Sequence, residues 1–452
     1  MTVRAPGAQP ITSTRTSRAR TSSMRIDGAT LGCVYAIALT AIPAKMILKG
    51  IPLALTPAAV VGLLTGVVWF CTQMVTTLGV AKGRNVVRTT LFIYASTQLA
   101  TYGYATFGFL PPDELSATDR VLITVTALIA IAIGVCDGVR GIDRLTKLLR
   151  VVVVGAAIMA FFGLLQFFVG FDITKSVSIP GLKPATTDMS YVLERASFPR
   201  PAGTAGHPIE YGVVCAMITP LALHFGFRAK ADGRKRWPWW LATTLIAVGA
   251  MLSLSRSAIL GLAVAGLVLF PGWPAKRRKQ MLLATPLFLV VMRLMVPGLL
   301  GTLYSLFANI SDDPSAQHRT KAIELAGQQV DQHLWLGRGL GTYLPTKYGW
   351  LDNQYLGTLV ENGLIGLAAF GMLFLIGMGA ALRARSMTRD PTERDLALSL
   401  TACLAVPAIS AATFDLLGFS VASGFTFLLV GACGALLRTM RERRTELVGV
   451  GS

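Results

Sequence analysis

The sequence contains little charge, since only 14% of its 452 residues are Asp, Glu, Lys or Arg, whereas soluble proteins average about 25%. This scarcity excludes a soluble multidomain enzyme, a disordered chain and a fibrous repeat. Hydrophobic residues make up 53% of the chain, and the mean hydropathy is +0.58. Long apolar stretches recur from Leu31 to Leu437, which predicts an all-α, polytopic membrane protein.

Cysteine and histidine are also scarce, with six and four residues. The cysteines lie in or at the ends of apolar segments and form no CxxC pair, so they do not indicate a disulfide or metal framework. His318 and His333 have no nearby cluster of ligands. We therefore expect no metal and no cofactor.

Acidic residues number 23 against 42 basic ones, a formal charge of +19. The basic residues are spread over short segments between the apolar stretches. Such a distribution is a membrane-topology signal, and we expect no nucleic-acid partner.

The apolar stretches predict about twelve membrane spans, each near the ~20 residues that a helix needs to cross the hydrocarbon. If the N-terminus is cytoplasmic, every inner segment holds three to five lysines or arginines. We therefore predict a tail at 1–28 that is disordered, a transmembrane domain at 29–437 and a tail at 438–452, with both tails cytoplasmic. The predicted spans are 29–48, 52–74, 87–108, 120–137, 149–171, 208–227, 238–254, 257–273, 281–303, 355–382, 396–413 and 417–437.

Two outer loops are long, at about 172–207 and 304–354, and they concentrate the polar residues of the chain. In the second loop, Asp313-Pro314 is typical of a helix start. Apolar residues at Ile323, Ala326, Val330 and Leu334 then predict an amphipathic helix. It ends at a glycine run, 335–343, which contains the candidate substrate-binding residue Arg338 and could offer backbone N–H groups to phosphate.

Arg256 lies in Leu252-Ser-Leu-Ser-Arg-Ser257, at the outer hinge between two predicted spans. A guanidinium there could hold an anionic substrate group at the lipid–water boundary. The alternative is an arginine that extends to lipid phosphates. The three serines around it favour the first interpretation.

In four other regions, polar or charged side chains lie inside or at the ends of predicted membrane spans, where their burial costs free energy. Arg293 and Glu361 lie inside predicted spans, and each has a functional or a structural interpretation. His207 and Glu210 precede and open one span, where either could accept a proton, or Glu210 could simply cap its helix. Asp352 and Asn353 lie where the second outer loop enters a span, as site residues or as an N-cap.

The hinge, an arginine at 319 opening the long loop and the glycine run together resemble the O-antigen ligase and O-antigen polymerase superfamily. So does the stretch from Asp352-Asn-Gln-Tyr-Leu356 to Glu361-Asn-Gly-Leu-Ile-Gly366. The resemblance covers about residues 195–375. It implies an enzyme of the outer face of the bacterial cytoplasmic membrane that joins a glycan from a polyprenyl diphosphate to an acceptor hydroxyl, without a metal.

The resemblance implies that Arg256 and Arg319 bind the diphosphate and stabilise it as a leaving group. In ligases of this family a histidine usually precedes the residue equivalent to Asn353, and here that position is Asp352. The catalytic base is therefore Asp352 or His207. Glu210, Arg338, Asn353 and Glu361 are candidate substrate-binding residues.

Two other functions remain open from the sequence. A secondary transporter or flippase would use Arg293 and Glu361 near the membrane midplane and would not need Arg319. A non-catalytic assembly protein would tolerate Arg256→Ala.

Overall fold

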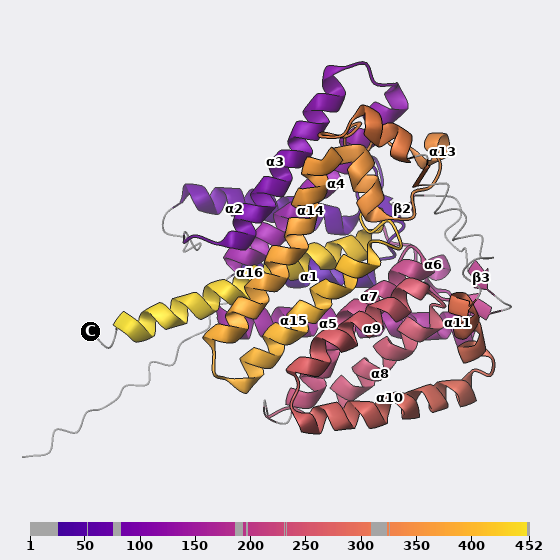
Figure 1. The fold of residues 1–452 in the computed structure, drawn as a ribbon, viewed down its shortest axis with the longest axis vertical. Helices are drawn as coiled ribbons and strands as arrows, with labels where there is room; N and C mark the ends of the chain where they lie inside the picture. The colour runs from indigo at the N-terminus through magenta and orange to yellow at the C-terminus, as the bar shows by residue number, and fades with distance from the viewer. Residues whose placement is uncertain are drawn as a thin grey trace, which may run out of the picture.

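The structure is a computed structural model that describes residues 26–51, 53–75, 83–185, 193–195, 198–229, 231, 233–308, 323–324 and 326–449. It is built almost wholly of helices (Figure 1). The helices are α1 (Gly28–Ala41), α2 (Pro57–Met74), α3 (Val86–Phe107), α4 (Pro112–Gly138), α5 (Gly141–Phe168), α6 (Ile173–Ser176), α7 (Pro208–Arg228), α8 (Trp237–Leu252), α9 (Arg256–Gly272), α10 (Ala275–Met295), α11 (Leu299–Ala308), α13 (Pro345–Tyr348), α14 (Gln354–Met387), α15 (Pro391–Ser410) and α16 (Ser420–Gly449). The strands are β1 (Met46–Leu48), β2 (Leu182–Pro184), β3 (Leu193–Arg195) and β4 (Phe198–Arg200).

Each of the twelve predicted spans coincides with a helix, and two of the predicted ranges are wrong in part. The range 281–303 is divided into α10 and α11 around Pro297-Gly298, where Gly298 has a φ of +89° that interrupts a helix. The range 29–48 is helical only to Ala41, and its last residues form β1.

Six of the described helices are long and apolar enough to cross a membrane: α2, α4, α5, α7, α14 and α16. Three further apolar helices, α1, α8 and α9, have 14 to 17 residues. A 14-residue helix is about 21 Å long, less than the ~30 Å of a hydrocarbon core. The chain is therefore a helical membrane protein, and twelve spans stay a prediction.

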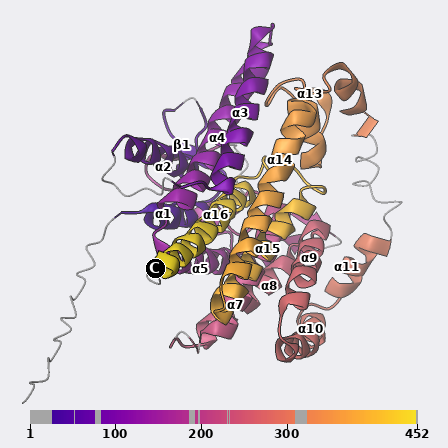
Figure 2. The same cartoon turned by 60° about the vertical axis from the view of Figure 1, so that its left-hand side comes forward.

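The centre of the molecule is formed by α7 and α16, which are the most deeply buried of the six helices. α16 packs against α4, α14 and α15, whereas α7 packs against α8, α9 and α15. Small residues allow this close approach, because a Cβ at Gly431 of α16 would lie 2.4 Å from the carbonyl oxygen of Ala132. Figure 2 shows α10 and α11 at the edge of this bundle.

Contacts between helix ends join segments that are predicted to lie on the same side of the membrane. On the predicted outer side, β1 pairs with β2 in antiparallel register, with Met46 opposite Pro184. On the predicted inner side, Asp27 caps α1 and pairs with Arg144 at 2.5 Å. These contacts fit the predicted alternation of the helices, whose orientation in the membrane stays a prediction.

The two predicted tails differ from one another. Most of the first, residues 1–25, lies outside the described part of the chain. The described part of the second, 438–449, continues α16 as a helix. There the guanidinium of Arg438 donates to the carbonyl oxygen of Cys136 at 3.3 Å, which fastens α16 to the end of α4.

Candidate functional site

Four helices begin beside the turn at 411–419, on the predicted outer side. Ser257, in the first turn of α9, shares a 2.6 Å hydrogen bond with Thr413 of this turn. Gln354 at the start of α14 accepts a 2.6 Å bond from the Leu417 N–H. The turn leads directly into α16, and Glu210 in the first turn of α7 accepts from the backbone of Val421 at 2.6 Å. The starts of α7, α9, α14 and α16 are thus held together by short polar contacts.

This arrangement has a direct electrostatic consequence. The N-terminus of a helix carries roughly half a positive charge and unpaired N–H groups. Side chains already cap three of these ends, since His207 caps α7, Asn353 caps α14 and Glu210 caps α16. The start of α9 has no side-chain cap, so it is the end that favours an anionic group. A diphosphate is one such group.

Arg256 is the first residue of α9 and adds a full positive charge at this end. The hinge before it is tight, because Leu254 has a φ of +49° that side chains rarely adopt. Arg200 fastens the hinge by donating from Nε to the Ser253 carbonyl oxygen at 3.1 Å. The side chain of Arg256 is half-buried, whereas Ser253, Ser255 and Ser257 are buried. The hinge serines thus form a packed support that positions Arg256.

His207 is the N-cap of α7, with Nδ1 accepting from the Ile209 N–H at 3.1 Å. Burial of the imidazole, together with the nearby charges of Arg200 and Lys45, lowers the pKa of His207 to about 4. The ring is neutral at pH 7, with the proton on Nε2 because Nδ1 is an acceptor. A group of this kind is a weak base toward a substrate hydroxyl.

Glu210 is buried, and its carboxylate accepts three backbone hydrogen bonds. The donors are the N–H groups of Gly206 at 2.7 Å, Val421 at 2.6 Å and Ala422 at 3.2 Å. The carboxylate caps α16 as well as lying in the first turn of α7. These contacts make Glu210 a structural residue of the site rather than a substrate ligand.

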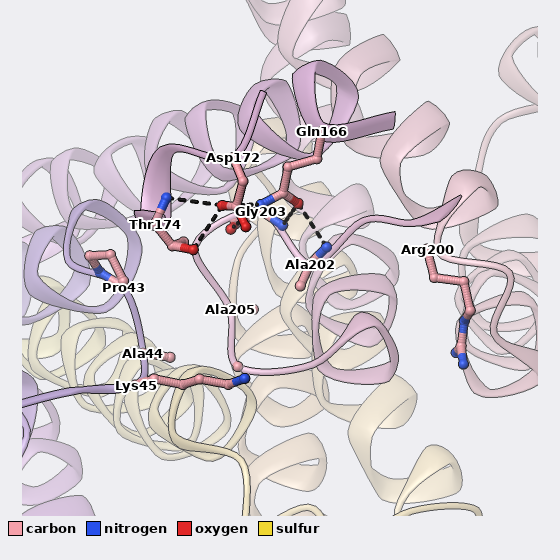
Figure 3. Close-up of a pocket in the computed structure, with 11 residues that line it drawn as sticks. Pro43, Ala44, Lys45, Gln166, Asp172, Thr174, Arg200, Ala202, Gly203 and Ala205 are labelled. Carbon is pink, nitrogen blue, oxygen red and sulfur yellow. Dashed lines mark hydrogen bonds between the residues drawn. The ribbon is translucent and has the colours of Figure 1, made fainter. Parts of the chain in front are cut away.

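A small polar pocket lies before α7, lined in part by Lys45, Gln166 and Asp172 (Figure 3). The Gln166 side chain donates to Asp172 at 3.0 Å and accepts from the Gly203 N–H at 2.7 Å. The pocket has a volume of about 20 Å³, which is room for about one water molecule. It cannot hold a sugar ring in this conformation, and its polar groups stabilise the loop.

The glycine run covers a break in α14. Gly363, with φ 63° and ψ −166°, interrupts the helix. The free carbonyl groups at this kink are bound by the run: the Arg338 N–H donates to Val360 at 2.8 Å and the Gly339 N–H to Glu361 at 2.9 Å. The Leu364 N–H donates in turn to the Leu334 carbonyl oxygen at 2.9 Å. The run thus replaces the helical hydrogen bonds that the kink removes.

Glu361 completes this joint, because its carboxylate accepts from the backbone N–H groups of Gly341 and Tyr343. Three N–H groups of the run, those of Gly339, Gly341 and Tyr343, are therefore directed at Glu361. The interpretation of these amides as a phosphate cradle is wrong for this conformation. They bind a carboxylate and a carbonyl group of the protein instead.

Arg338 is bound by protein groups as well. Its guanidinium lies 3.1 Å from the Glu114 carboxylate on α4 and stacks 4.1 Å from the ring centre of Tyr348. Tyr348 donates to Glu114 at 2.8 Å, and Lys347 lies 3.3 Å from it. Glu114 is only 1% exposed, so this cluster fastens the second outer loop to α4.

Asp352 and Asn353 precede α14 and have different surroundings. Asn353 is the N-cap, and its side-chain oxygen accepts from the N–H groups of Tyr355 at 2.9 Å and Leu356 at 3.2 Å. The Asp352 side chain is exposed. Asp415 of the 411–419 turn lies near it, and desolvation together with the charge of Asp352 raises the pKa of Asp415. The proximity of this second carboxyl group could not be predicted, since 63 residues separate the two acids along the chain.

The remaining predicted residues lie apart from this cluster or outside the described residues. Arg293 is exposed in the last turn of α10, so it is neither buried nor in the middle of a packed helix. Arg319 and the predicted helix start at Asp313-Pro314 lie outside the described residues. Of the predicted amphipathic face, Ala326 is buried and Val330 packs beside it, whereas Ile323 and Leu334 are exposed.

Comparison with protein families matches residues 241–371 to Wzy_C, described as O-Antigen ligase. This part of the chain, here called the O-antigen ligase region, is similar to that family. The O-antigen ligase region covers α8, α9, α10 and the kink of α14. It contains six of the eight predicted site residues, all except His207 and Glu210. A search of curated proteins gave no match.

Proposed function

We propose that the protein is a glycosyltransferase that joins a glycan from a polyprenyl diphosphate to an acceptor hydroxyl, at the outer face of a bacterial cytoplasmic membrane. The observation that carries the proposal is the position of Arg256 at the start of α9, within the O-antigen ligase region. There the guanidinium and the dipole of α9, whose start has no side-chain cap, both favour an anion. The product is a polymerised lipid-linked glycan or a glycan ligated to a carrier.

In the proposed reaction the acceptor oxygen attacks the anomeric carbon of the donor glycan. A new C–O bond forms, the bond from that carbon to the diphosphate oxygen breaks, and polyprenyl diphosphate leaves with the electron pair. Arg256 and Arg319 stabilise the leaving diphosphate, because its charge increases in the transition state. The acceptor proton passes to a carboxylate.

We infer that Asp352 is this carboxylate. Its side chain is exposed at the start of α14, with Asp415 close by. His207 is the weaker candidate, because its acceptor nitrogen is occupied and its pKa is about 4. Asn353, Glu361, Arg338 and Glu210 act indirectly, by holding α14, the outer loop and α16 in place.

The transporter alternative receives less support from the geometry. It requires Glu361 and Arg293 to exchange partners near the membrane midplane. Glu361 instead fastens the outer loop to the α14 kink, and Arg293 is exposed at the end of α10.

Deletion of the gene, followed by mass spectrometry of polyprenyl-linked glycans, tests the proposed function. Single repeat units accumulate if the protein is a polymerase, and long lipid-linked chains accumulate if it is a ligase. Wild type and Arg293→Ala are expected to restore the normal pool, whereas Arg256→Ala and Arg319→Ala are not. An unchanged pool on deletion contradicts the proposal, and failure of Arg293→Ala alone favours transport.

A further inference from the structure

A large apolar cleft opens between α8, α9 and α10, with α7 as its floor. Its volume is about 1150 Å³. It exists because α8 and α9 each pack on α7 rather than on one another. α10 lies beyond them at the edge of the molecule (Figure 1).

The cleft has two chemically different ends. At one end its lining contains Arg236, Lys276 and Arg277, from the start of α8 and the start of α10. Toward the other end the lining is apolar, with Met251, Ile259 and residues of α10 such as Phe288 and Leu289. No acidic residue is among the described residues that line the cleft.

The three basic side chains at this end differ in whether they could bind an anionic ligand. Arg277 lies 2.6 Å from Asp395 and stacks on the ring of Phe227 at 4.7 Å, so the protein neutralises its charge. The side chains of Arg236 and Lys276 are exposed. Two positive charges thus stand at the mouth of an apolar space, at the end of the bundle that is predicted to be cytoplasmic.

We propose that this cleft binds an anionic phospholipid, with the acyl chains between α8, α9 and α10 and the head group at Arg236 and Lys276. An apolar space at membrane depth is suited to hydrocarbon chains, and basic groups between helices on the cytoplasmic side bind anionic head groups. The polyprenyl chain of the glycan donor is a poorer fit. Its diphosphate would lie near Arg256 at the start of α9, and Arg236 and Lys276 at the other end of the cleft would then face no anion.

Native mass spectrometry of the full-length protein, released from nanodiscs of equal parts phosphatidylglycerol and phosphatidylcholine, tests the proposal. We expect phosphatidylglycerol to be retained by wild type and to fall at least tenfold in the double variant Arg236→Gln/Lys276→Gln. The matched control is Lys235→Gln/Lys279→Gln. It removes two neighbouring charges that do not line the cleft, and it should retain the lipid as wild type does.

A second variant distinguishes lipid binding inside the cleft from attraction of lipid to surface charges. Gly266 lines the cleft, and a Cβ added there meets no atom within 4 Å, so Gly266→Phe introduces a ring into the cleft with no clash at Cβ. It should reduce lipid retention to the same extent while the thermal midpoint in lipid-free detergent stays unchanged. Equal retention in all variants, retention of phosphatidylcholine instead, or retention of a polyprenyl phosphate from the host membrane would overturn the proposal. Arg256→Ala should retain the lipid, so this test does not depend on the transferase activity.

Discussion

At the scale of single residues, Arg256 is the side chain on which the proposed chemistry depends most. Arg256→Ala should lower glycan transfer by about 100- to 1000-fold, as removal of one donor to a developing charge commonly does. Arg256→Lys should recover part of this loss, because lysine keeps the charge and loses the bidentate geometry. Transfer of the isolated lipid-linked glycan to its acceptor is the measurement, and equal rates for all three proteins would refute the role.

The same assay distinguishes between Asp352 and His207 as the catalytic base. We expect Asp352→Asn to remove most of the activity and His207→Asn to keep most of it, since asparagine is also a good N-cap. The opposite pattern would make His207 the base.

The lowered pKa of His207 also predicts how stability depends on pH. The imidazole takes up a proton at about pH 6.5 in the unfolded chain, and only at about pH 4 in the folded protein. Between these values the unfolded state binds more protons, so stability falls as the pH is lowered from 6.5 to 4. The thermal midpoint of wild type should therefore fall more over this window than that of His207→Asn, and parallel curves would contradict the assignment.

The sequence predicted where the charged candidate residues lie better than it predicted their roles. Arg256 lies where the sequence placed it, at a helix hinge. The structural roles of Glu210 and Arg338 were not predictable, because their partners Val421 and Glu114 are 211 and 224 residues away. A single sequence carries no signal for such pairs.

At the scale of elements, the joint is the contact between the kink of α14 and the glycine run at 335–343. Its close packing explains why a glycine occurs on each side of the contact. A Cβ at Gly363 would lie 2.3 Å from the Trp335 carbonyl oxygen, and one at Gly337 would lie 2.4 Å from the Glu361 backbone. Both glycines also have a positive φ. The helical pattern of 355–382 predicted a helix correctly, but periodicity cannot show a kink that a distant loop stabilises.

Gly363→Ala and Gly337→Ala should each destabilise the protein, by roughly 1–3 kcal/mol from backbone strain alone and more from the clash. Gly371→Ala is the matched control, since it lies in the same helix with open space around its Cβ position. It should be neutral or stabilise the protein by up to about 1 kcal/mol. Thermal unfolding in detergent compares the three, and equal midpoints would contradict the described joint.

At the scale of the whole molecule, hydrophobic runs predicted the helices well, because each run must be buried in lipid or in the bundle. They predicted helix lengths less well, since α1 and the α10–α11 break depend on local backbone geometry. The predicted orientation is testable with single cysteines in a variant without the native ones. Phe109→Cys and Trp350→Cys should react with a membrane-impermeant maleimide in intact cells, whereas Thr388→Cys should react only after lysis; the reverse would invert the topology.

The proposed transferase activity is tested most directly by glycan transfer with purified protein in liposomes, with the lipid-linked glycan that accumulates in the deletion strain as donor. We expect wild type and Arg293→Ala to release polyprenyl diphosphate together with an elongated or ligated glycan, and Arg256→Ala not to do so. Release by Arg256→Ala at the wild-type rate would refute the proposed transfer reaction, as would movement of the intact donor across the membrane without transfer.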